Sequence, residues 1–104
     1  MVGKTDYEKV RAFAKRLRKD YSDAEVILFG SRAKGEALEE SDFDIIAVSK
    51  EFGGINFFRR IEKMYDYWAE KEPLEVFCYT PEEFEEKKRQ IGIVKAASAS
   101  KVTA

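Results

Sequence analysis

Histidine is absent from this chain of 104 residues, and it has a single cysteine. Without histidine there can be no histidine-dependent catalytic triad, no imidazole general base and no histidine-ligated zinc or iron. The lone Cys78 excludes an intrachain disulfide and a cysteine-rich zinc site. Carboxylates are therefore the natural metal ligands of this chain, and they favour hard cations such as Mg²⁺ or Mn²⁺.

Long hydrophobic runs are also missing, and neither sign of charge dominates. No apolar run approaches the roughly 20 residues of a membrane span, and the N-terminus has no apolar signal segment. We therefore expect a cytoplasmic protein without membrane contact. A formal net charge of −1 provides no general attraction for nucleic acid, so no direct nucleic-acid binding is expected. The length predicts one domain over residues 1–104, with a weakly ordered tail from about residue 96.

The hydrophobic pattern predicts helices that alternate with short strands. Strands are expected over 26–29, 42–48 and 74–79. Helices are expected over about 6–20, about 55–71 and from 80 onward, with a break near Gly92, and capping boxes are expected at Thr5 and Thr80. This order predicts an α+β protein of two layers, in which helices pack on a small mixed β-sheet.

The segment Phe29-Gly30-Ser31-Arg32-Ala33-Lys34-Gly35 follows the first expected strand. Its backbone N–H groups and the Ser31 hydroxyl could hold phosphate oxygens, and a β-carbon at Gly30 would hinder that approach. Arg32 and Lys34 could neutralise part of a triphosphate. The alternative is that glycine and serine mark an ordinary turn.

Two carboxylates, Asp42 and Asp44, lie in the second expected strand, and Glu75 lies in the third. The alternation of a strand puts Asp42 and Asp44 on one face, about 7 Å apart, where both could reach one metal ion. Glu75 is the best candidate for a third ligand or a general base. The alternatives are that the aspartates are solvated or paired with Arg32 or Lys34, and that Glu75 faces solvent from an edge strand.

Together, Gly30 to Gly35 and Ser41-Asp42-Phe43-Asp44-Ile45 resemble the signature of the minimal nucleotidyltransferases of the polymerase β superfamily. The resemblance implies a polymerase β-type fold in which Gly30 and Ser31 hold the β and γ phosphates of a nucleotide such as ATP. It also implies that Asp42 and Asp44 bind Mg²⁺ and that a carboxylate on a later strand completes the site. Glu75 falls at that later position, where the family more often has aspartate.

The resemblance further implies how an acceptor is supplied. Larger relatives carry an additional domain, whereas small ones often act as antitoxins of helical HEPN toxins and can transfer AMP from ATP to a toxin tyrosine. The acceptor pocket is therefore expected from another polypeptide or from a homo-oligomer. Two alternatives remain: a non-catalytic module that neutralises its partner by occlusion, and transfer to a small molecule such as an aminoglycoside.

Four aromatic residues of the segment 55–71 allow two interpretations. Their helical spacing favours a place in the core, whereas exposure would make them a partner surface. They are Phe57, Phe58, Tyr65 and Trp68.

Overall fold

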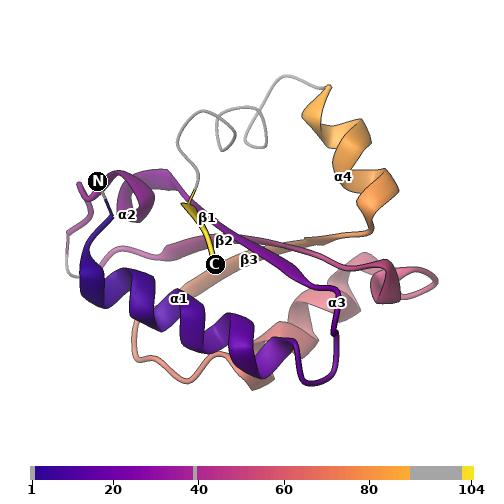
Figure 1. Cartoon of the computed structure of the whole chain (residues 1–104), viewed down its shortest axis with the longest axis horizontal. Helices are drawn as coiled ribbons and strands as arrows, with labels where there is room; N and C mark the ends of the chain where they lie inside the picture. Colours follow the sequence, from indigo (N-terminus) through magenta and orange to yellow (C-terminus); the bar gives the residue numbers. More distant parts are fainter. Residues whose placement is uncertain (1, 39, 90–101) are drawn as a thin grey trace.

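The structure is a computed structural model that describes residues 2–38, 40–89 and 102–104. These residues form a four-stranded sheet with helices on both faces (Figure 1). The order along the chain is α1 (Lys4–Leu17), β1 (Glu25–Phe29), α2 (Gly30–Lys34), β2 (Phe43–Val48), α3 (Phe57–Met64), β3 (Leu74–Tyr79), α4 (Pro81–Lys88) and β4 (Val102–Thr103). Short 3₁₀ turns, Lys50–Phe52 and Tyr65–Tyr67, flank α3.

The sheet has the strand order β3-β2-β1-β4. β1 pairs antiparallel with both β2 and β4, whereas β2 and β3 run parallel. This mixed pairing confirms the predicted α+β fold. No helix in the described ranges combines the length and the apolar character needed to cross a bilayer.

Alternation along β2 divides its side chains between the two faces of the sheet. Phe43, Ile45 and Ala47 join the larger core, which α1 and Met64 of α3 cover. Ile46 and Val48 join a smaller core on the other face, which α4 covers with Phe84. The face with the smaller core is therefore less covered by helices. The side chain of Asp44 lies on that face, because neighbouring residues of a strand alternate and Ile45 belongs to the larger core.

The strands lie where the sequence predicts them, but the helix ends differ. α1 begins at Lys4 after Gly3, with no side-chain cap, so the capping box predicted at Thr5 is wrong. The capping box at Thr80 is confirmed, because its hydroxyl accepts from the Glu83 N–H while the Glu83 carboxylate accepts from the Thr80 N–H. α3 is shorter than predicted and ends at Met64.

The C-terminal residues form a strand that the sequence pattern did not predict. In β4, Val102 pairs with Leu28 and Thr103 with Ile27. The Ala104 N–H donates to the Val26 carbonyl at 2.9 Å. The prediction of a weakly ordered tail therefore does not hold for residues 102–104, while the break expected near Gly92 lies outside the described residues.

The four aromatic residues around α3 divide between core and surface. Trp68 packs on the larger core, with its ring 5.0 Å from that of Phe43, and Phe57 packs against the smaller one. Phe58 and Tyr65 are 72% and 50% exposed. Phe57 and Trp68 therefore fit the interpretation as core residues, and Phe58 and Tyr65 fit the interpretation as surface residues.

Candidate active site

Three strands bring the predicted site residues together at one end of the sheet. β1 runs into α2 there, and β2 and β3 both begin there. Phe29, which precedes Gly30, pairs with Asp44, and Asp44 pairs with Glu75. Directly paired residues project from the same face of a sheet. The glycine turn, Asp44 and Glu75 are thus neighbours across three strands.

Gly30 lies against the carboxylate of Asp44. A β-carbon at this position would lie 2.5 Å from Asp44 Oδ2, and Gly30 has a φ of +75°. Only glycine adopts such a conformation without strain. The turn and the carboxylate are therefore fitted to each other, and glycine is required both for conformation and for space.

The remaining residues of the turn form the short helix α2. Ser31 is half-buried in its first turn, directly after Gly30, and Lys34 is exposed at its last residue. Gly35 ends the helix in a left-handed conformation, with a φ of 77°. The turn thus keeps Ser31 close to Asp44 and Lys34 at the surface.

Negative charge accumulates around Asp44. The pKa of this carboxyl is raised, first by burial and then by repulsion from Glu75 and Asp42. Asp42 is exposed just before β2, and Glu75 is exposed on β3, the outermost strand. A bound cation would relieve this repulsion, and the oxygen donors suit a hard ion.

The carboxylates are near one another without forming a ready-made metal cage. Within the described ranges, no group of three histidine, cysteine, aspartate or glutamate side chains is gathered closely enough to hold an ion. Asp42 and Glu75 are exposed, so their side chains are free of the packing that would fix them in place. The three carboxylates therefore suit Mg²⁺ by the chemistry of their oxygen atoms and by their closeness to one another. To bind one ion together, the exposed Asp42 and Glu75 side chains would have to turn toward Asp44.

Arg32 has a different position from the one expected. It is 4% exposed, and its Nη1 donates to both carboxylate oxygens of Asp6, at 3.0 and 3.1 Å. Its Nε and Nη2 donate to the Ser41 carbonyl at 3.0 and 2.7 Å, and its guanidinium lies 4.2 Å from the centre of the Phe43 ring. Arg32 therefore ties α1 and α2 to the segment that leads into Asp42, which gives it a structural role.

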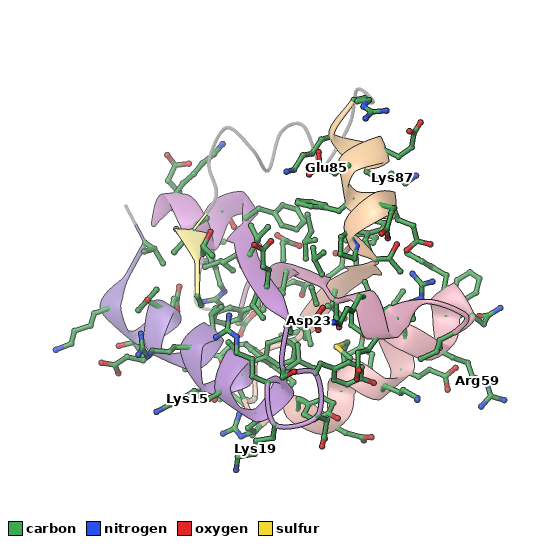
Figure 2. All side chains as sticks on the ribbon, turned by 45° about the vertical axis from the view of Figure 1, so that its right-hand side comes forward. Lys15, Lys19, Asp23, Arg59, Glu85 and Lys87 are labelled. Atoms are coloured by element: carbon green, nitrogen blue, oxygen red, sulfur yellow. The ribbon has the colours of Figure 1, made fainter. Side chains whose placement is uncertain are left out.

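We expect Arg32→Ala to destabilise the protein by about 2–4 kcal/mol, because breaking a buried ion pair typically costs about 3–5 kcal/mol and Asp6 keeps some solvent contact. Urea denaturation would measure the change. Arg59, an exposed arginine that Figure 2 shows at the surface of α3, is the matched control. Arg59→Ala should change the free energy of unfolding by less than about 0.5 kcal/mol. Equal midpoints for the two variants would contradict the structural role of Arg32.

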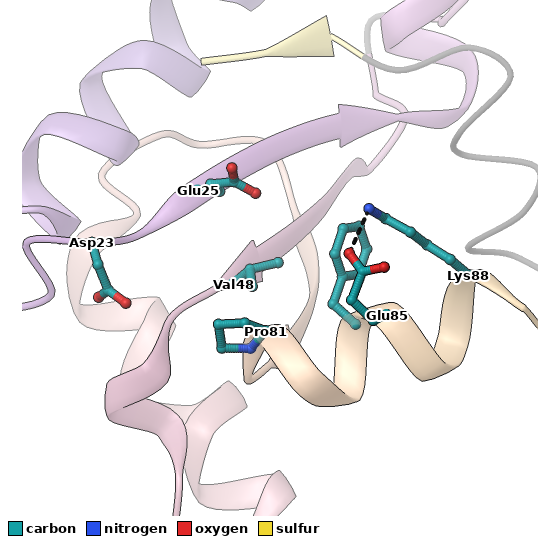
Figure 3. Close-up of a pocket in the computed structure, with 7 residues that line it drawn as sticks. Asp23, Glu25, Val48, Pro81, Glu85 and Lys88 are labelled. Carbon is teal, nitrogen blue, oxygen red and sulfur yellow. Dashed lines mark hydrogen bonds and ion pairs between the residues drawn. The ribbon is translucent and has the colours of Figure 1, made fainter.

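A hollow on the less covered face of the sheet contains acidic side chains, two of which are engaged in hydrogen bonds or an ion pair (Figure 3). Asp23, Glu25, Val48, Pro81, Phe84, Glu85 and Lys88 line it. Asp23 accepts from the Ser49 hydroxyl at 2.6 Å and from the Lys50 N–H at 2.9 Å, and these bonds lower the pKa of its carboxyl. Glu85 pairs with Lys88 at 3.0 Å. Asp23 is thus engaged with the residues that follow β2, and Glu85 with Lys88.

The fold and the site together have the form that the resemblance implied: a glycine turn and carboxylates at one end of a small mixed sheet. The chain matches the nucleotidyltransferase domain over residues 10–99, a range that contains Gly30, Asp44 and Glu75. The protein therefore belongs to the nucleotidyltransferase domain family, and it is an enzyme of that class.

One solved structure agrees with this assignment, and a second shares only the fold. A candidate nucleotidyltransferase from Sulfolobus solfataricus shares 27% identity, with a TM-score of 0.54, over 97% of this chain and 86% of its own. BolA1 from Arabidopsis thaliana shares 24% identity, with a TM-score of 0.56, over 72% of this chain and 94% of its own. The second likeness concerns the fold alone. No curated protein matches the chain significantly.

Proposed function

We propose that this protein transfers a nucleoside monophosphate, AMP from ATP, to a hydroxyl acceptor with Mg²⁺ or Mn²⁺ as cofactor. The observation that carries the proposal is the contact of Gly30 with Asp44, and the pairing of Asp44 with Glu75, in a chain of the nucleotidyltransferase domain family.

In this proposal the turn and the carboxylates have separate roles. Gly30 and Ser31 bind the β and γ phosphates through backbone N–H groups and the hydroxyl, and Lys34 neutralises part of their charge. Asp42, Asp44 and Glu75 hold the cation, which would supply charge neutralisation at the triphosphate. Arg32, expected to contact phosphate, instead holds the loop that carries Asp42.

The transfer itself exchanges one bond to the α phosphorus for another. The acceptor oxygen forms a bond to that phosphorus, the bond to the bridging oxygen breaks, and pyrophosphate leaves with the electron pair. In this proposal Glu75, which is exposed on the edge strand β3, accepts the proton of the attacking hydroxyl or completes the ligand set.

The acceptor that we propose is a tyrosine of a HEPN-type toxin, with this chain as the antitoxin of the pair. The resemblance to the minimal nucleotidyltransferases supports this choice, and the exposed Phe58 and Tyr65 provide an apolar surface for a protein partner. A second copy of the chain is the alternative source of the acceptor site.

Incubation with labelled ATP, Mg²⁺ and the product of the neighbouring gene tests this function. We expect label on a tyrosine of that product, and its loss when EDTA replaces Mg²⁺. Labelling that persists in EDTA would contradict metal-dependent transfer. Release of pyrophosphate that depends on an aminoglycoside would instead favour a small-molecule acceptor.

Neutralisation of the partner by occlusion, without transfer to it, is the second candidate, and the exposed Phe58 and Tyr65, on which a partner could be seated, favour it. In that case the complex would protect RNA from the toxin without ATP. Equal protection by an Asp42→Ala/Asp44→Ala variant would establish occlusion, whereas protection that requires ATP would support transfer.

A further inference from the structure

An aromatic hollow lies on the less covered face of the sheet, along the second half of β3. Phe57, Phe77, Tyr79, Glu83 and Lys87 line it, and its volume is about 360 Å³. This volume lies at the lower end of the range for small-molecule sites and suits a single ring-sized group. None of these residues belongs to the site predicted from the sequence.

The hollow continues directly from Glu75 along β3. Alternate residues of a strand share a face, so Phe77 and Tyr79 project on the same side as Glu75. Phe77 follows Glu75 by about 6.6 Å along the strand. Exposure falls in the same direction, from the exposed Glu75 through the half-buried Phe77 to the buried Tyr79. Glu75 does not line the hollow, but it is the same-face neighbour of Phe77, the first residue of β3 that does.

The two charged side chains of the hollow differ in whether they are paired with other groups of the protein. Glu83 accepts from Arg60 Nη1 at 2.6 Å and from the Thr80 N–H at 2.7 Å, so its charge is already compensated. Lys87 makes no hydrogen bond or ion pair with any residue in the described part of the chain. Figure 2 shows Lys87 on the opposite side of α4 from Glu85. The available charge of the hollow is therefore positive.

The order of groups across the sheet indicates what the hollow binds. The phosphate turn follows β1, the deepest carboxylate is on β2, and Glu75 and the hollow are on β3. If Glu75 receives the acceptor proton, the group that carries the acceptor hydroxyl must lie over β3.

We propose that this hollow is the acceptor subsite: it takes an aromatic ring that carries the hydroxyl, and Lys87 selects an acceptor with negative charge beside that ring. The inference rests on the proposed nucleotidyl transfer and narrows its substrate class. It disfavours polycationic acceptors such as aminoglycosides. Phe58, in ring contact with Phe57 at 6.1 Å and largely exposed, extends the apolar surface outward, as a ring presented by a protein segment requires.

Amide NMR of the full chain without nucleotide tests the inference. The probes are 4-hydroxyphenylacetate, an anionic phenol, tyramine, a cationic phenol of similar size, and kanamycin. We expect 4-hydroxyphenylacetate to shift the amides of Phe77, Tyr79 and Lys87, and to bind more tightly than tyramine by about two- to fivefold, the range of an exposed charge pair. Lys87→Glu should reverse this preference.

Lys88→Glu is the matched control, because it makes the same change on the same helix but lines the hollow of Figure 3. It should leave the preference as it is. Equal binding of the two phenols, an equal effect of both lysine variants, or tighter binding of kanamycin in the hollow would overturn the inference.

Two further probes separate this inference from the proposed function. ATP and tripolyphosphate should both shift the amides of Gly30 and Ser31 in the presence of Mg²⁺, and neither should shift those of the hollow. Failure of both to shift Gly30 and Ser31 would count against nucleotidyl transfer, even if the phenols bind as expected. Shifts in the hollow with ATP and not with tripolyphosphate would assign it to the nucleobase and overturn the acceptor subsite.

Discussion

Asp44→Asn is expected to lower nucleotidyl transfer by about 10³-fold and to raise the melting temperature of the metal-free protein. The loss follows because metal stabilisation of transition-state charge contributes several kcal/mol, and each 1.4 kcal/mol or so is a factor of ten in rate. The gain in stability follows because the folded protein holds Asp44 partly buried and close to Glu75 and Asp42, which raises the pKa of its carboxyl.

The sign of the stability change depends on pH. A carboxyl whose pKa is higher in the folded state than in the unfolded one destabilises the fold when it is ionised in both states, so the benefit of asparagine is largest near pH 7. The benefit should shrink as the pH falls through the raised pKa and vanish below the ordinary value of 3.8. Thermal denaturation in EDTA at pH 7 and pH 3.5, beside steady-state transfer assays, measures both effects.

Asp66→Asn makes the same chemical change at an exposed position of the turn after α3. It should leave transfer unchanged and should not reproduce the pH-dependent gain in stability. A melting temperature of Asp44→Asn at pH 7 below that of the unchanged protein would show that the charge of Asp44 is compensated. Full transfer activity in this variant would remove it from the metal site.

Gly30→Ala is expected to abolish measurable transfer and to destabilise the protein by about 2–5 kcal/mol. Part of the cost, about 1–2 kcal/mol, is the left-handed conformation, which a β-carbon disfavours. The rest, about 1–3 kcal/mol, is overpacking, because the new methyl group would lie 2.5 Å from Asp44 Oδ2. Either the turn or the carboxylate must move, and both belong to the proposed site.

Gly54→Ala separates these two costs. Gly54 has a φ of +78°, close to that of Gly30, but an added β-carbon would meet nothing within 4 Å. This variant should therefore show the conformational cost alone, about 1–2 kcal/mol, with transfer retained. If urea denaturation shows equal destabilisation of Gly30→Ala and Gly54→Ala, the Asp44 side chain moves away from the new methyl group at little cost in free energy.

The sequence predicted those parts of the fold that depend on local pattern. Runs of apolar, β-branched and aromatic residues located β2 and β3, whereas the pairing of Asp44 with Glu75 emerged only from their register in the sheet. Capping chemistry located the start of α4 at Thr80 because its partner Glu83 is three residues away. β4 escaped prediction because a strand of two residues has no period to detect.

Features that depend on distant residues could not be predicted. Arg32 beside a glycine turn has the composition of a phosphate ligand, and only the folded chain brings it to Asp6, 26 residues earlier. The aromatic hollow is lined by residues from α3, β3 and α4, and their spacing in the sequence does not indicate that they line one pocket. The site was therefore predicted where its residues are close in sequence or paired in register, and missed where tertiary packing assembles it.

The contacts of Arg32 link the first turn of α1 to the segment that leads into the proposed active site. One guanidinium holds Asp6 near the start of the chain, its own helix α2, and the Ser41 carbonyl just before Asp42. We therefore expect the three segments to lose their order together, so that fraying of the first turn of α1 would loosen the segment before Asp42. An affinity tag or a partner that disturbs the start of α1 would thereby regulate transfer from outside the active site.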